Sequence, residues 1–148
     1  MKKFTVQDIM NKEPCPDYTE EVVTELWKDK KSLTFKEVCS LDIDTEDRIW
    51  IAVRLASKAT VVSWANYCAD EAKKHADATA TAYRATTAYW ADAATTNAYY
   101  AANAANYADY AALYAAYAAY YAAPNRFKAR NEELERLLTK LVEMHEVE

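Results

Sequence analysis

The residues that could carry nucleophilic or metal chemistry are few and lie far apart in this chain. The three cysteines stand at positions 15, 39 and 68 without a Cys-x-x-Cys pair, and His75 and His145 are isolated. A zinc site needs such ligands clustered, so we expect no metal. Cys68 and His75 share a helix face but lie about 10.5 Å apart along its axis. We therefore interpret Cys68 as a core residue and expect no catalytic residue and no cofactor.

Carboxylates provide a second group of candidates, in the acidic segment Asp42, Asp44, Glu46 and Asp47. General acid–base catalysis needs one carboxylate in an apolar pocket. These residues instead stand where a helix would begin, and the N-terminus of a helix favours negative charge. Two interpretations stay open. The segment either only begins a helix, or it forms an acidic patch that meets a basic partner through Asp42, Asp44 and Asp47.

Tyrosines are the most abundant candidates for binding. Between Tyr99 and Tyr121 they occupy three adjacent heptad positions, and alanine fills the remaining positions except at Asp109. The pattern predicts a helix with a tyrosine face and an alanine face. The tyrosines either pack as core with their hydroxyls at the rim or form an exposed binding surface, because tyrosine is enriched at interfaces. The binding candidates on this face are Tyr100, Tyr107, Tyr110, Tyr114 and Tyr117.

Arg84 is the only basic residue between positions 76 and 123, a stretch that holds ten of the twelve tyrosines. Two interpretations stay open for it. Arg84 forms an ion pair with Asp77 or Asp92, or it binds an anionic ligand. In the second case Tyr83 and Trp90 would supply stacking, and a nucleotide would be the ligand.

Composition excludes several classes of protein. The chain has no glycine, which argues against β-rich folds, a phosphate-binding P-loop and a dinucleotide-binding fingerprint. The net charge of −5 argues against a nucleic-acid partner. No apolar run reaches the roughly 18 residues of a membrane span, and no apolar stretch follows Lys2 and Lys3. We expect a cytoplasmic protein with reduced cysteines and no membrane partner.

These candidates must be positioned by an all-α fold, which we expect to form one domain over residues 1–148. Residues 1–57 predict short capped helices, with capping boxes that begin at Thr5 and Thr34. Residues 58–123 predict long alanine- and tyrosine-rich helices that form a hairpin, against which the short helices pack. After Pro124, residues 124–148 predict an amphipathic C-terminal helix.

The long alanine-rich region must be interrupted. An unbroken helix over residues 59–123 would be about 97 Å long, too long for a domain of this size. We expect one break between Asp77 and Thr81. We expect a hairpin or kink between Asp92 and Asn97, because poor helix formers cluster there and Trp90 lies out of register with the later tyrosines.

Four segments of the chain carry a more specific pattern. They are residues 9–27, which contain Pro14-Cys15-Pro16-Asp17, and residues 41–43, 46–54 and 64–72. With the alanine/aromatic repeats and the charged, leucine-rich tail, they resemble a group of small alanine-rich bacterial and phage proteins described as immunity proteins. The chain departs from this group in having tyrosine where others often carry tryptophan or arginine, and in Pro124. The resemblance implies a small binding protein without catalytic residues.

Three hypotheses follow. The first is a non-enzymatic, phage-encoded inhibitor or immunity-type protein in the bacterial host cell. It would neutralise a toxin or a host defence component by direct binding, through residues 42–47 and the exposed tyrosines. The second is a protein that sequesters a small nucleotide signal. The third is a structural protein whose alanine face closes a homo-oligomer.

Overall fold

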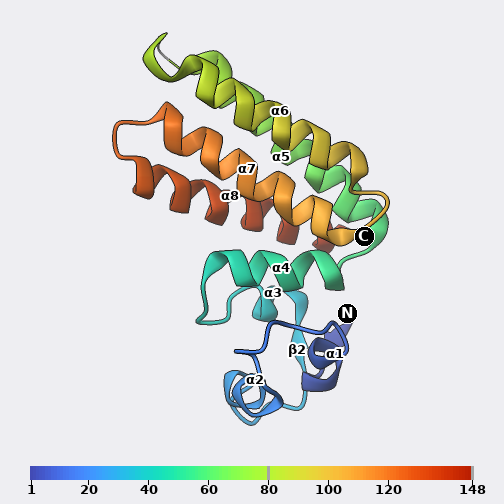
Figure 1. The fold of residues 1–148 in the computed structure, drawn as a ribbon. Helices are drawn as coiled ribbons and strands as arrows, with labels where there is room; N and C mark the ends of the chain where they lie inside the picture. The colour runs from blue at the N-terminus through green and yellow to red at the C-terminus, as the bar shows by residue number, and fades with distance from the viewer. Residues whose placement is uncertain (80, 148) are drawn as a thin grey trace.

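The chain forms a bundle of long helices that packs against a smaller N-terminal unit (Figure 1). The computed structural model describes residues 1–79 and 81–147. In this part of the chain the fold is all-α, as predicted, apart from two short antiparallel strands, β1 (Lys3–Phe4) and β2 (Leu33–Thr34). The sequence analysis did not predict this pairing, in which Lys3 lies opposite Thr34 and Phe4 opposite Leu33.

The N-terminal unit is built from short helices that begin at capping residues. Both predicted capping boxes are present: Thr5 caps α1 (Val6–Met10) and Thr34 caps α3 (Phe35–Val38). Thr19 caps α2 (Glu20–Leu26) by accepting a hydrogen bond from the Val22 amide. These side chains satisfy amide groups that a helix cannot pair itself, which explains why helices this short begin at these residues.

The larger part contains α4 (Thr45–Leu55), α5 (Lys58–Ala78), the 3-10 turn η1 (Thr81–Tyr83), α6 (Arg84–Tyr100), α7 (Ala105–Ala122) and α8 (Arg126–Glu146). Helices α5 to α8 run alternately in opposite directions (Figure 1). Helix α7 lies between α6 and α8 and also contacts α4 and α5. Helix α4 contacts α3 on one side and the α7–α8 pair on the other. None of the described helices is long and apolar enough to cross a membrane.

The predicted breaks are confirmed at one place and wrong at the other. Helix α5 ends at Ala78, within the predicted range from Asp77 to Thr81. Residue 80 of that range lies outside the described residues. No kink separates Asp92 from Asn97, because α6 continues to Tyr100. The side chains of Thr95, Thr96 and Asn97 bond the carbonyl groups four residues earlier, at 2.9, 3.0 and 2.9 Å. Such bonds let these residues remain inside a helix.

The chain turns instead at residues 101–104, where the Asn103 amide donates to the Tyr100 carbonyl at 2.9 Å. The described part of residues 58–123 therefore contains three α-helices and the short turn η1, and not a two-helix hairpin. The heptad of tyrosines is divided between α6 and α7. It stays continuous in space because the rings of Tyr100 and Tyr107 lie 5.6 Å apart across the turn.

The alanine face of α7 lies in the centre of the bundle. Its alanines are almost completely buried: Ala108, Ala111, Ala112, Ala115, Ala116, Ala118 and Ala119. A methyl side chain allows neighbouring helix backbones to approach closely, which explains how one helix can contact several others. Because this face is buried within the chain's own fold, it is not free to close an oligomer, as the third hypothesis requires.

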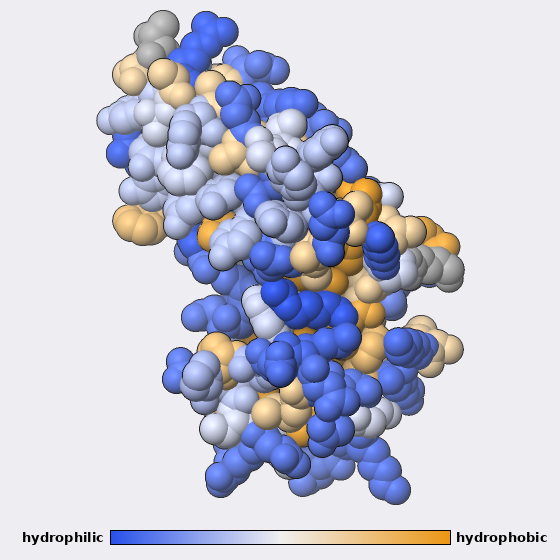
Figure 2. Space-filling model, turned by 45° about the vertical axis from the view of Figure 1, so that its right-hand side comes forward, coloured by the Kyte–Doolittle hydropathy of each residue, from blue (hydrophilic) through white to orange (hydrophobic). Residues whose placement is uncertain are grey.

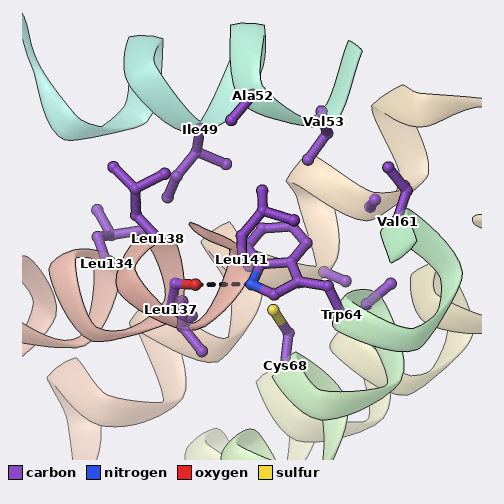
Figure 3. Close-up of a cluster of buried hydrophobic side chains, with 14 of the residues drawn as sticks. Ile49, Ala52, Val53, Val61, Trp64, Cys68, Leu134, Leu137, Leu138 and Leu141 are labelled. Atoms are coloured by element: carbon purple, nitrogen blue, oxygen red, sulfur yellow. Dashed lines mark hydrogen bonds between the residues drawn. The ribbon is translucent and has the colours of Figure 1, made fainter. Parts of the chain in front are cut away.

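Larger side chains fill the region where α4, α5 and α8 meet (Figure 3). The residues gathered there include Ile49, Ala52, Val53, Val61, Trp64, Cys68, Leu134, Leu137, Leu138 and Leu141. The Trp64 indole N–H donates to the Leu137 carbonyl at 2.6 Å. This bond satisfies the polar group of a fully buried indole and joins α5 to the middle of α8.

Candidate functional site

The outer face of α6 and α7 carries a group of aromatic side chains, which we call the tyrosine surface. It consists of Trp90, Tyr100, Tyr107, Tyr110, Tyr114 and Tyr117. None of the six is fully buried, and Tyr100 and Tyr110 are each 43% exposed. Figure 2 shows pale side chains, the colour of weakly hydrophilic residues such as tyrosine, gathered over the upper part of the molecule. The tyrosines therefore cover the bundle and do not form its core.

Ring contacts hold the centre of the tyrosine surface in place. The Trp90 ring on α6 lies 4.8 Å from the Tyr117 ring and 5.4 Å from the Tyr114 ring on α7. Tyr114 in turn stacks on Tyr110 at 6.0 Å. These separations fall in the range in which aromatic pairs attract one another. The surface is thus preorganised, since its side chains are already ordered by their neighbours.

The charges that border this surface are mostly paired. Asp109 of α7 forms an ion pair with Arg54 of α4 at 3.0 Å, and the Arg54 guanidinium lies 3.9 Å from the centre of the Trp50 ring. Burial raises the pKa of Asp109, an effect that its hydrogen bond from Arg54 opposes. The pair leaves the border of the surface close to neutral.

The acidic segment lies beside the tyrosine surface. Glu46 forms an ion pair with Arg130 of α8, whose guanidinium lies 5.6 Å from the centre of the Tyr117 ring. Arg130 therefore touches both predicted binding regions. Their adjacency could not be read from the sequence, because Glu46 and Arg130 are separated by 84 residues.

The three predicted aspartates of this segment have different surroundings. Asp47 accepts a hydrogen bond of 2.6 Å from the Tyr18 hydroxyl, beside an apolar pocket of about 90 Å³. Burial and this carboxylate raise the pKa of Tyr18. Asp44 precedes α4 without capping it through its side chain, and both Asp44 and Asp42 are exposed. Asp42 and Asp44 are thus accessible to a partner, whereas Asp47 is committed to Tyr18.

Tyr83 and Arg84 lie apart from the tyrosine surface. The Tyr83 ring contacts Tyr121, 6.4 Å away, whereas the ring contacts of Trp90 on α7 are with other residues. The structure therefore does not assemble Tyr83, Arg84 and Trp90 into one stacking site. Within the described residues Arg84 is exposed and makes no ion pair with Asp77 or Asp92. Its predicted structural pairing is wrong.

The cysteines and histidines do not converge. Cys68 is buried in the core, as predicted, and burial raises the pKa of its thiol. Cys15 is an exposed free thiol. His75 lies 3.2 Å from the buried carboxylate of Glu133, which Arg136 also contacts. Among the described residues no group of three or more histidines, cysteines and carboxylates could hold a metal ion.

Several residues that the sequence analysis did not select belong to these regions. Tyr89 and Tyr99 are 65% and 79% exposed beside Trp90 and Tyr100. Arg126 and Arg130 were missed because the tail was interpreted only as an amphipathic helix. A signal was present, since the break at Pro124 sends the chain back along α7 and brings the first residues of α8 beside its tyrosines.

Comparisons of the chain with models of protein families, with curated proteins and with solved structures find no match. The resemblance to immunity-type proteins therefore stays an expectation.

Proposed function

We propose that this chain is a non-enzymatic binding protein that docks on a basic protein partner through the tyrosine surface. In line with its resemblance to immunity proteins, we further propose that it is phage-encoded. It would act in the cytoplasm of the bacterial host by occluding a toxin or a host defence component. The observation that carries the proposal is the row of ordered, partly exposed aromatic rings on α6 and α7.

The state of these rings supports binding. Tyrosine and tryptophan provide a large contact area at low cost in conformational entropy, and here ring contacts have already restricted their rotamers. Less entropy remains to be lost when a partner binds, which favours affinity.

Charge supports a basic partner. No lysine or arginine occurs from position 85 to position 125, and the chain carries a net charge of −5. The protein's own Arg130 lies over Tyr117, which shows that rings of this surface accept guanidinium groups. Attraction between a cation and an aromatic face contributes about 0.5–2 kcal/mol. A partner that presents arginines would meet the rings and, in Asp44, an exposed carboxylate that lines the same hollow as Arg130.

The proposal is tested by capture from host lysate followed by reconstitution. Immobilised wild-type protein and the double variant Tyr110→Ser/Tyr114→Ser are compared by quantitative mass spectrometry. We expect one basic protein to be enriched by the wild type and lost from the variant. With that protein purified, each substitution should weaken binding by about 2 kcal/mol, or roughly 30-fold in Kd.

Val22→Ser is the control, because Val22 is an exposed apolar residue on α2 in the N-terminal unit. It should capture the same protein with unchanged affinity. A partner retained by the double variant, or a partner with an acidic contact face, would overturn the proposal.

A further inference from the structure

At one end of the bundle lies a second aromatic group, which is separate from the tyrosine surface. It surrounds an open hollow of about 730 Å³ where the α7–α8 connection meets the start of α6. Figure 1 shows the α5–α6 corner and the α7–α8 connection at the same end of the bundle. Four aromatic residues line the hollow: Tyr83, Tyr120, Tyr121 and Phe127. Tyr83 and Phe127 are 44% and 72% exposed, so ring surface faces solvent here.

Arg126 lies among these rings. Its guanidinium is 4.2 Å from the centre of the Tyr83 ring, 5.8 Å from Tyr120 and 5.9 Å from Tyr121. The tyrosines orient the guanidinium group but do not neutralise its charge. In the described part of the chain Arg126 forms no ion pair, and the residues lining the hollow include no carboxylate. Of the described residues that line the hollow, only Arg126 carries a charge.

The beginning of α8 adds to this positive potential. The side chain of Asn125 makes no capping bond, and the first turn of the helix contains no acidic residue. The partial positive charge of the helix N-terminus therefore reinforces Arg126 and is not offset by a neighbouring acid.

We propose that this hollow is a binding site for a nucleoside phosphate, with Arg126 as the phosphate ligand and the exposed rings as the stacking surface for the base. A guanidinium group presents donors in a planar fork that matches the oxygens of a phosphate. Every base offers a face that stacks on an aromatic side chain, a contact that is tolerant of base identity. The volume falls within the range of small-ligand sites, about 300–1,000 Å³.

The test is titration of the isotopically labelled full chain with adenosine 5′-monophosphate, adenosine and inorganic phosphate, followed by NMR. The monophosphate should bind with a Kd below about 1 mM and shift signals of residues 82–83 and 120–127. Adenosine and inorganic phosphate should each bind at least tenfold more weakly, because adenosine lacks the phosphate and inorganic phosphate lacks the base. Equal binding of either compound, or shifts located elsewhere, would overturn the proposal.

Two variants identify the cation. Arg126→Gln should weaken binding of the monophosphate at least tenfold. Lys128→Gln removes the same charge from the same turn of α8, but Lys128 does not line the hollow and pairs with Glu132. It should change binding less than threefold. Equal losses would indicate general electrostatic attraction and reject the site.

Tyr83→Leu keeps Arg126 and removes one stacking ring, which provides an independent variant should Arg126→Gln disturb the fold. It should weaken binding of the monophosphate severalfold while leaving the weak affinity for inorganic phosphate unchanged. If it weakens both equally, stacking has no part in the site. None of these variants lies in the tyrosine surface, so the outcome does not depend on whether a protein partner binds there.

Discussion

Trp64 illustrates how single residues secure this fold. Its side chain has no exposed surface, and its indole N–H reaches a main-chain carbonyl of α8. The ring therefore contributes both apolar burial and a bond that satisfies its one polar group. That Trp64 lies on a long helix could be predicted from the sequence. Its bond partner, 73 residues away, could not, because no local pattern specifies which carbonyl it meets.

Trp64→Phe should lower the free energy of unfolding by about 2 kcal/mol, since it removes the hydrogen bond and leaves a cavity. Urea denaturation followed by far-UV circular dichroism measures the change. Trp90→Phe is the matched control, because Trp90 is only partly buried and, in the part of the chain that the structure describes, its side chain makes ring contacts but no hydrogen bond. Its effect should stay below about 1 kcal/mol, and an equal loss in both variants would contradict this account.

Among the elements, α7 best shows what sequence could and could not predict. The heptad spacing predicted two chemically distinct faces, which the helix has. It could not decide which face is buried, because tyrosine tolerates partial exposure and alanine is compatible with core or surface. The decision depends on tertiary packing, since four other helices contact α7. The position of the preceding turn was missed for a local reason, the bonds from Thr95, Thr96 and Asn97 back to their own helix.

Substitutions on the two faces of α7 should differ in their effect on stability. Ala115→Leu inserts a larger side chain at a fully buried position and should destabilise the protein by about 1–3 kcal/mol through overpacking. Tyr110→Leu, on the exposed face, should change stability by about 0.5 kcal/mol or less. Thermal denaturation of both variants checks the contrast, and tolerance of Ala115→Leu would place the core elsewhere.

The capping box of α3 should contribute to the acid sensitivity of the protein. Hydrogen bonds from Lys30 and from the Thr34 amide lower the pKa of Glu37 from 4.5 to about 2. Because the folded state favours the carboxylate, its contribution is complete above about pH 5 and is lost as the pH falls towards 2. Glu37→Gln should therefore have a lower Tm than the wild type at pH 7, and the difference should disappear near pH 2. A difference independent of pH would contradict this.

At the scale of the whole molecule, Arg48 connects parts of the chain that are distant in sequence. Its side chain, 16% exposed, donates to the carbonyls of Ile43 and Cys39 and forms an ion pair with Glu135 of α8 at 2.5 Å. Burial raises the pKa of Glu135, but hydrogen bonds from Thr45 and Arg48 lower it overall. One guanidinium group thus fixes the loop before α4, α4 itself and the bundle relative to one another.

Arg48→Met should remove about 2 kcal/mol of stability, because it leaves two carbonyl groups without their donor and the Glu135 carboxylate without its ion-pair partner. The loss should affect the N-terminal unit and the bundle together. Hydrogen exchange should show faster exchange in both α3 and the facing part of α8. Faster exchange confined to α3 would show that the two parts are joined by other contacts.

The division of α7 into a methyl-lined face and an aromatic face determines which of its positions can accept substitutions during evolution. Substitutions at the exposed aromatic positions, such as Tyr110, alter the exterior and leave the buried alanines unchanged, whereas the interior positions tolerate almost nothing larger than a methyl group. The outward-facing side chains can therefore change while the packing of the helices stays the same. This would suit a protein whose partner is itself changing, since lost recognition could be restored by exchanging one outward ring for another.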